Sequence, residues 1–262
     1  MNQPEYRLRV PVLSRNNLDF PDIETAQQQR DGLVAVGGDL SPARILAAYR
    51  QGIFPWYSPD EPIMWWSFAQ RMVLFPAELK VSRSLAKNLR NKPYAVTMNY
   101  AFRQVIANCA QTPRPGQNGT WLSAEMQQAY YSLHQQQYAC SFECWYRDTD
   151  GNTILAGGLY GVLIGQIFYG ESMFAHASDA SKIAFVHAVH YLQQQGVPLI
   201  DCQVYTDYLA SFGARKIPYA EFAACLHEFN PRSLAQPDSF KSQILADNGV
   251  IPLPRDNPEL NY

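Results

Sequence analysis

The sequence predicts a mixed α/β fold in which helices interrupt a central run of strands. Three observations support this prediction. Hydrophobic residues make up 47% of the 262 residues and charged residues 17%, which favours a packed core over disorder. From about residue 79 onward, segments with helical periodicity alternate with short apolar runs. Elements in that order are typical of a sheet covered by helices.

The first part of the chain, residues 10–76, is rich in turns and contains one clear helix. Ser41 is suited to cap that helix, Pro42 to occupy its first position and Gly52 to end it. The next segment, GIFPWYSPDEPIMWW, combines aromatic rings with Pro, Gly and Asp. Helices avoid that composition, so we expect a structured loop.

Beyond residue 79 the predicted elements follow one another closely. The first are a basic helix over 82–91, a strand over 95–98, a helix capped by Asn99, a loop over 111–120, a helix through 126–133 and a strand over 139–146. The others are a hairpin turn at 148–152, two apolar strands folded at Gly165, a helix from Ser178 or Asp179 to Gly196, a strand over 198–204 and two short helices ending near Gly213 and Asn230. We expect the tail to lie loosely on the surface.

Membrane, secreted and metal-binding classes are not favoured. No apolar run approaches the roughly 20 residues that span a bilayer, and the N-terminus lacks a secretory signal. The five cysteines are odd in number and form no CxxC pairs, so we expect reduced thiols. His187 and His190 have helical i,i+3 spacing but no evident third ligand. We therefore predict a cytoplasmic protein with no membrane partner, no metal and no cofactor.

The charge distribution is uneven although the net charge is only −2. Residues 71–120 contain one acid, Glu78, and eight basic residues: Arg71, Lys80, Arg83, Lys87, Arg90, Lys92, Arg103 and Arg114. That stretch therefore carries +7 and the remainder −9. Such asymmetry fits a basic face that holds a phosphate backbone, and equally a solvated helix surface.

Two strands carry candidate catalytic side chains. Asp201 and Gln203 lie two apart in LIDCQV, so alternation places both on one face of a strand. Such a pair needs partners when buried, and it fits either catalysis or a structural hydrogen bond. Glu171 follows Gly170 in YGESMF, where it could meet an attacking amine or lie in an exposed turn.

Other patterns are less specific. The glycines of GGLYG, residues 157–161, are followed by more strand rather than a helix, so a bulge or a close approach is favoured over a phosphate loop. Neither a Ser-His-Asp nor a Cys-His pattern indicates covalent catalysis. Trp56 and Trp121 lie in Gly/Pro loops, where they could stack on a base as well as pack in a core.

Eight motifs in order resemble the leucyl/phenylalanyl-tRNA–protein transferases. They are LVAVGGDLSPARILAAYRQGIFPW from residue 33, MWWS at 64–67, MNYAF at 98–102, GTW at 119–121, GGLYGV at 157–162, GESMF at 170–174, ASK at 180–182 and LIDCQ at 199–203. This chain departs from the family after WWS, where it reads FAQR and keeps only Arg71 of the usual basic run. The first 30 residues are poorly covered by the resemblance.

The resemblance implies a small N-terminal domain, residues 1–72, and an acyl-CoA N-acyltransferase-like domain, residues 73–262. It implies transfer of Leu, Phe and less readily Met from aminoacyl-tRNA to proteins that begin with Arg or Lys. Such transfer marks those proteins for the bacterial N-degron pathway. The partners would be Leu-tRNA or Phe-tRNA and the acceptor protein, and we expect a monomer because no self-complementary surface is indicated.

The resemblance also implies roles for individual residues. Gln203 would align the acceptor amine, Asp201 would orient Gln203 and help accept a proton, and Glu171 would bind or orient the cationic acceptor. An apolar pocket with Ser172 at its rim would hold the aminoacyl side chain, lined by Leu159, Phe168, Met173, Phe185 and Ile200. Trp56 and Trp121 would sandwich the terminal adenosine. The tRNA backbone would follow Arg71, Lys80, Arg83, Lys87, Arg90 and Lys92.

Two other functions are each compatible with part of the sequence. A small-molecule N-acyltransferase that uses acyl-CoA would need a glycine-rich pyrophosphate loop at a helix N-terminus, and none is found in the sequence. A noncatalytic RNA-binding module would explain the basic stretch and the aromatics. It would not explain the polar Asp201/Gln203 pair and Glu171 within apolar strands.

Overall fold

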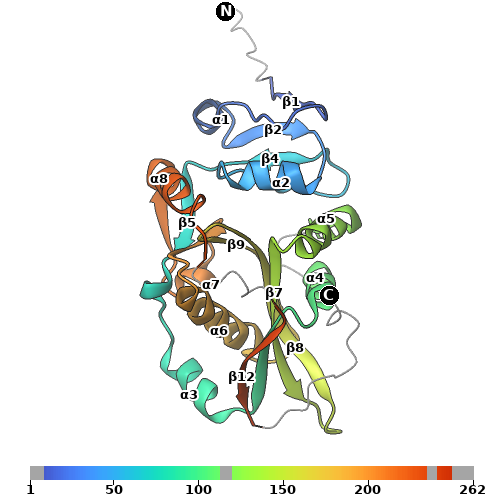
Figure 1. Cartoon of the computed structure of the whole chain (residues 1–262), viewed down its shortest axis with the longest axis vertical. Coiled ribbons are helices and arrows are strands. Elements are labelled where there is room, and N and C mark those ends of the chain that lie inside the picture. Colours follow the sequence, from blue (N-terminus) through green and yellow to red (C-terminus); the bar gives the residue numbers. More distant parts are fainter. Residues whose placement is uncertain (1–8, 113–119, 235–240, 250–262) are drawn as a thin grey trace, which may run out of the picture.

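The computed structural model describes residues 9–112, 120–234 and 241–249 and contains two sheets (Figure 1). The small sheet has the order β1 (Val12–Leu13), β2 (Leu33–Gly37), β4 (Met64–Trp66), β3 (Phe54–Pro55). The large sheet has the order β11 (Arg215–Pro218), β5 (Gln70–Leu74), β10 (Leu199–Gln203), β9 (Ile167–Ala175), β8 (Thr153–Ile164), β7 (Ala139–Arg147), β6 (Tyr94–Met98), β12 (Gln243–Asn248). The mixed α/β fold class is confirmed.

The helices divide between the two sheets. Beside the small sheet are α1 (Ile23–Gln29) and α2 (Pro42–Tyr49); with the large sheet are the 3₁₀ turn η1 (Pro76–Glu78), α3 (Arg83–Asn91), α4 (Phe102–Gln111), α5 (Ala124–Gln135), α6 (Ala180–Gln194), α7 (Asp207–Ala210) and α8 (Tyr219–Phe229). Because β5 belongs to the large sheet, the domain boundary predicted after residue 72 falls inside this strand. That division stays a prediction.

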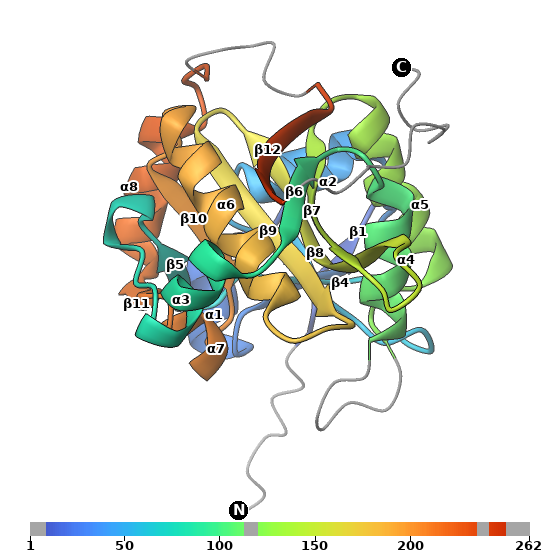
Figure 2. The same cartoon turned by 90° about the horizontal axis from the view of Figure 1, so that it is seen from below.

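The large sheet separates two hydrophobic cores. Figure 2 shows α6 on one face and α4 and α5 on the other. Along β8, Leu159 and Leu163 pack into the core beneath α6, while Tyr160 and Val162 pack into the core shared with α4, α5 and the small sheet. Alternating side chains of one strand therefore serve both cores. Strands buried on both faces appear in the sequence as continuous apolar runs.

Several predicted elements are confirmed by their local chemistry. The side chains of Ser41 and Ser82 cap α2 and α3, each accepting a hydrogen bond from a backbone N–H of the first turn. Gly165 turns β8 into β9 with a φ of 56°. Gly196 follows α6 with a φ of 82°, the left-handed conformation that glycine adopts without strain.

Other predictions are wrong for identifiable reasons. The expected loop 52–66 contains β3 and β4, whose strands are short and pair across the small sheet. Asn99 does not cap α4; its side chain accepts a hydrogen bond from the Ser141 backbone on β7. Part of the expected loose tail forms β12, which pairs antiparallel with β6. The Asn99 contact and β12 depend on partners distant in sequence, whereas β3 and β4 pair with each other across a short connection.

The glycines of GGLYG permit close packing within the chain. A Cβ on Gly157 would lie 2.7 Å from the Ala180 Cβ at the start of α6. At Gly161 the β8–β9 register shifts, and a Cβ would meet the Phe168 ring. The extra residue at this shift is Glu171 on β9, so Gly161 permits close packing while the bulge lies on the neighbouring strand.

Candidate functional site

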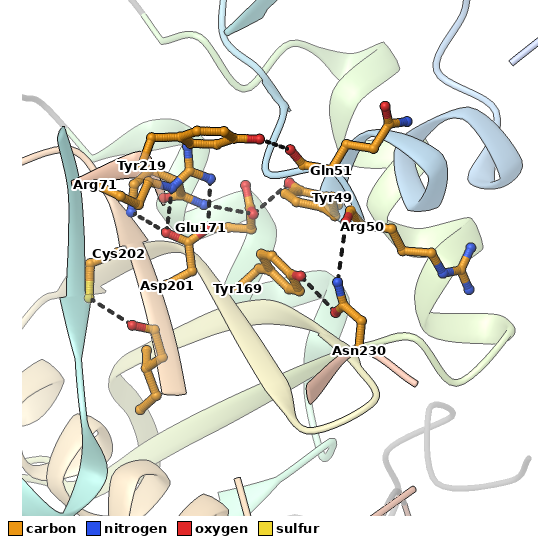
Figure 3. A network of polar contacts seen from close by, with 12 residues as sticks. Tyr49, Arg50, Gln51, Arg71, Tyr169, Glu171, Asp201, Cys202, Tyr219 and Asn230 are labelled. Atoms are coloured by element: carbon orange, nitrogen blue, oxygen red, sulfur yellow. Dashed lines mark hydrogen bonds and ion pairs between the residues drawn. The ribbon is translucent and has the colours of Figure 1, made fainter. Parts of the chain in front are cut away.

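The predicted catalytic residues meet where α2 and α5 approach the middle of the large sheet. Figure 3 shows Glu171 and Asp201 with several of their partners. Glu171 comes from β9, Asp201 and Gln203 come from β10, and Tyr49 comes from the last turn of α2. Both strands are irregular at this point. Glu171 has no partner opposite it on β8, and Cys202 has none on β5, so each strand carries a bulge.

Asp201 forms a buried ion pair with Arg71. The Arg71 Nε and Nη2 atoms donate to the two carboxylate oxygens at 2.8 and 2.7 Å, and both side chains are 0% exposed. The guanidinium also lies between the rings of Phe54 and Phe222, at 4.7 and 4.8 Å from their centroids. Our expectation that Arg71 contacts tRNA is therefore wrong, because solvent does not reach its charge.

Gln203 is held in an unusual backbone conformation. Its φ is +54°, and its backbone N–H donates to Asp201 Oδ1 at 2.9 Å. Asp201 therefore contacts the backbone of Gln203 rather than its amide group, and the bulge replaces the regular alternation that we expected. Since both oxygens of buried Asp201 accept from Arg71, this geometry favours orientation over proton acceptance.

Glu171 connects Gln203 to two tyrosine hydroxyls. Its Oε1 accepts from Gln203 Nε2 at 3.1 Å and lies 2.6 Å from the Tyr49 hydroxyl. Its Oε2 lies 2.7 Å from the Tyr130 hydroxyl, and the two hydroxyls are 2.8 Å apart. Burial raises the pKa of Glu171 to about 7, against the opposing effect of these hydrogen bonds.

Tyr49 and Tyr130 were not among the predicted site residues. Both are fully buried, and burial first and the charge of Glu171 second raise their pKa values well above the usual range. Both lie on helices that the sequence predicts, Tyr49 on the helix capped by Ser41 and Tyr130 on the helix through 126–133. A buried tyrosine hydroxyl needs a hydrogen-bond partner, and that requirement is the signal that could have identified them.

The residues of the predicted aminoacyl pocket lie together under the sheet but are closely packed. Leu159, Phe168, Phe185 and Ile200 are at most 3% exposed and belong to the core beneath α6. Met173 is partly buried against the same core, and Ser172 is 8% exposed. An aminoacyl side chain would enter this cluster only if these side chains moved. The pocket stays a prediction.

A cavity of about 520 Å³ lies nearby, between the end of α2 and α8. Its lining includes Arg50, Gln51, Tyr219 and Asn230. Tyr219 donates to the Gln51 carbonyl at 2.9 Å, and the Asn230 amide donates to the Arg50 carbonyl at 3.3 Å. The cavity thus borders the polar network without including the predicted catalytic residues.

The two tryptophans assigned to adenosine binding lie on neighbouring segments. Trp56 follows β3 and is 36% exposed, and Trp121 is partly buried just before α5. Burial first, and then the nearby charge of Glu125 on α5, raise the pKa of Tyr57, the residue after Trp56. This proximity is compatible with the sandwich, which stays a prediction.

The other basic residues of the predicted tRNA track lie on α3 or within three residues of it, and α3 is at the end of the molecule away from the small sheet (Figure 1). Lys80, Arg83, Lys87 and Arg90 are exposed. Lys92 is partly buried: its Nζ donates to the Ser178 carbonyl at 2.9 Å and lies 4.1 Å from the Tyr146 ring centroid. Arg114 and Gly119 of the GTW motif lie outside the described residues.

The cysteines are free thiols, and the part of the chain that the structure describes has no group of three or more His, Cys, Asp or Glu side chains that could hold a metal. His187 Nε2 lies 3.0 Å from the Tyr94 hydroxyl, and burial lowers the pKa of this histidine to about 4. Among the described residues, no helix has the length and apolar character needed to cross a bilayer.

Comparison with known families identifies the family of this chain. The family described as leucyl/phenylalanyl-tRNA protein transferase matches residues 73–227, and its N-terminal domain matches residues 38–67. This chain belongs to the leucyl/phenylalanyl-tRNA–protein transferase family. It is an aminoacyltransferase that acts between tRNA and proteins, as the family resemblance predicted.

Bacterial transferases of the same name are similar over most of their length. The transferase of Chromobacterium violaceum is 58% identical over 80% of this chain and 87% of its own length. The transferase of Neisseria meningitidis serogroup B is 51% identical over 85% of this chain and 92% of its own length. The transferase of Anaeromyxobacter dehalogenans is 54% identical over 83% of this chain and 89% of its own length. A solved structure of L-PGS from Bacillus licheniformis aligns with 63% of this chain and 54% of its own, at 10% identity and a TM-score of 0.34, a likeness too distant to bear on function.

Proposed function

We propose that this transferase moves Leu, Phe and less readily Met from aminoacyl-tRNA to proteins that begin with Arg or Lys. The product carries a new peptide bond and is marked for degradation through the N-degron pathway. The family name supports the leucyl and phenylalanyl donors. The arrangement around Gln203 is the single observation that most supports the transfer step in this chain.

The hydrogen bond that Gln203 Nε2 donates to Glu171 orients the side-chain amide of Gln203. Because Nε2 donates to Glu171, the amide oxygen faces away from that carboxyl group. Within the described residues this oxygen accepts no hydrogen bond, and Gln203 is 9% exposed. It can therefore accept from the acceptor α-amine and align its lone pair with the ester carbonyl.

The reaction needs alignment more than activation. An aminoacyl ester is already reactive, and an α-amine with a pKa of about 7.7–8.0 is partly unprotonated at neutral pH. Near-attack geometry alone can supply a large part of the rate. A pocket of Leu159, Phe168, Phe185 and neighbouring side chains would accept Leu, Phe or Met, because apolar size discriminates by only about 1–3 kcal/mol per methylene.

We place the tRNA end near Trp56 and Trp121 and the tRNA backbone along the exposed basic residues of α3. Replacing Arg83 and Lys87 with Glu should weaken leucyl-tRNA binding by at least about tenfold and reduce the salt dependence of the affinity, since two phosphate contacts are lost. Filter binding at several salt concentrations measures both effects. Arg232→Glu, which changes an exposed arginine outside this track, is the control. Equal affinities for both variants would exclude α3 as the tRNA track.

Transfer of labelled leucine from leucyl-tRNA to peptides tests the acceptor rule. Three peptides that differ only in a first residue of Arg, Lys or Ala are compared. We expect label on the Arg and Lys peptides and none on the Ala peptide. Equal labelling of all three would reject the acceptor rule while leaving the transferase activity in place. We also propose that the enzyme is a cytoplasmic monomer, and light scattering of the purified protein tests the oligomeric state.

A further inference from the structure

Three oxygen-bearing side chains close a triangle beside Gln203. The Tyr49 and Tyr130 hydroxyls lie 2.8 Å apart, Tyr49 lies 2.6 Å from Glu171 Oε1, and Tyr130 lies 2.7 Å from Glu171 Oε2. All three distances are those of O–H···O hydrogen bonds. Two oxygens this close without a hydrogen between them would repel each other.

The number of hydrogens available for these three contacts indicates the protonation state of Glu171. Each tyrosine hydroxyl has one hydrogen, so the two tyrosines supply two hydrogens for three contacts. An ionised Glu171 supplies none, and one contact would then be left as two opposed lone pairs. A protonated Glu171 supplies the third hydrogen and completes the triangle.

The neighbouring amide determines which oxygen carries that hydrogen. Oε1 already accepts from Gln203 Nε2 at 3.1 Å, so Oε1 is an acceptor and Oε2 carries the proton. Oε2–H then donates to Tyr130, Tyr130 donates to Tyr49, and Tyr49 donates to Oε1. We propose that Glu171 is a neutral carboxylic acid in the resting enzyme, and that this closed ring with Tyr49 and Tyr130 positions Gln203.

The charged and titratable groups around the ring agree with this assignment. Besides its two tyrosine partners, Glu171 faces the Asp201 carboxylate of β10, which disfavours a second negative charge, and Arg71 of β5, which favours it. Tyr160 of β8 lies near Tyr49. Arg71 is paired bidentately with Asp201, so its charge is already balanced. Burial raises the pKa of Glu171 to about 7, which also favours the protonated carboxyl group.

A neutral Glu171 suits the reaction. An anion one hydrogen bond from Gln203 would raise the pKa of the acceptor amine and hold it as an ammonium ion, which has no lone pair for attack. The neutral ring orients Gln203 without this penalty. Tyr49, Tyr130 and Glu171 are therefore positioning residues, and this role rests on the proposed function of Gln203.

Glu143 provides a matched comparison within the same sheet. It is fully buried on β7, where burial raises its pKa and the four hydrogen bonds that it accepts lower it. Its carboxyl group, however, faces donors only: the hydroxyls of Thr97 and Ser141 and the backbone N–H groups of Tyr100 and Ala101. Thr97 accepts from Trp145 Nε1, so its own hydrogen is directed at Glu143. These donors satisfy an ionised carboxylate at the start of α4.

The two glutamates should respond oppositely to the same substitution. In Glu171→Gln the amide NH₂ takes the place of Oε2–H, and the ring stays closed. In Glu143→Gln the NH₂ group opposes other donors, and the melting temperature should fall. We expect Glu171→Gln to lose no more than about tenfold in kcat/KM, whereas Glu171→Ala should lose about 100-fold or more. A loss in Glu171→Gln as large as in Glu171→Ala, at an unchanged melting temperature, would overturn the proposal.

The pH profile gives a second measurement. In the wild type, ionisation of Glu171 as the pH rises through about 7 should oppose the gain from amine deprotonation, so kcat/KM should pass through a maximum. Glu171→Gln lacks this ionisation, and its kcat/KM should keep rising until the amine is deprotonated. Identical falling limbs in both enzymes would contradict the neutral ring.

Infrared spectroscopy tests the protonation state without any transfer reaction. With ¹³C-labelled glutamate, the wild type at a pH below about 7 should show the C=O band of a protonated carboxylic acid. The band should be missing from Glu171→Gln and present in Glu143→Gln. A band that disappears only in Glu143→Gln would overturn the assignment. The infrared band does not depend on which substrates the enzyme uses. A failure of the proposed function can therefore be distinguished from a failure of the neutral Glu171 assignment.

Discussion

Gln203→Ala should lower kcat for leucine transfer by about 100-fold and leave the affinity for leucyl-tRNA unchanged. The amide is held from two sides, by Asp201 through its backbone and by Glu171 through Nε2, so its loss removes an oriented group rather than a flexible one. Misplacement of a reacting group by about 1 Å can cost about 10²-fold in rate. Single-turnover transfer and filter binding measure the two quantities separately.

A second glutamine serves as the control for Gln203. Gln166→Ala removes an exposed amide at the turn between β8 and β9, where its Nε2 donates to the Ser233 carbonyl, and it should leave transfer unchanged. Full activity in Gln203→Ala would reject the assignment of Gln203. Loss of both transfer and tRNA binding would instead indicate a role in holding the tRNA end.

Arg71→Met should destabilise the protein by about 3–5 kcal/mol, because it leaves Asp201 buried without its partner. It also removes the cation between Phe54 of the small sheet and Phe222 of α8. The free energy of unfolding from urea titration measures the loss. At temperatures where the variant is folded, tRNA affinity should be unchanged, because Arg71 is buried.

The double variant Arg71→Met with Asp201→Asn separates charge from packing. Asn keeps an oxygen that can accept from the Gln203 backbone but carries no charge, so the double variant should be more stable than Arg71→Met alone. A double variant no more stable than the single one would mean that the aromatic contacts of Arg71, and not its charge, dominate its contribution.

Much of the fold was predictable because its signals are local. Ser41 and Pro42 start α2 through their own backbone chemistry, and Gly196 ends α6 for the same reason. The apolar runs on either side of Gly165 pair as β8 and β9 because the turn joins them directly. Features of this kind need no knowledge of distant residues. Strand β12 was not predictable in this way, since it pairs with the distant β6, and β3 and β4 are too short to give a clear periodicity.

Parts of the site were predictable for a different reason. Glu171, Asp201 and Gln203 are polar residues within apolar strands, and burial of a polar group requires partners. The sequence therefore singled them out and, through its motifs, indicated aminoacyl transfer. It did not identify their partners: the Asp201 carboxylate pairs with Arg71, 130 residues earlier in the chain, and Glu171 contacts Tyr49, 122 residues away.

The sequence by itself determined the fold class, the family and the polar residues in the strands, because these depend on composition, periodicity and motif order. Only the tertiary structure decided that Arg71 is a buried counterion rather than a tRNA contact, and that Glu171 closes a ring with Tyr49 and Tyr130. The physical reason is that charge state and accessibility belong to the surroundings of a side chain. Those surroundings are assembled from strands and helices that the chain order keeps far apart.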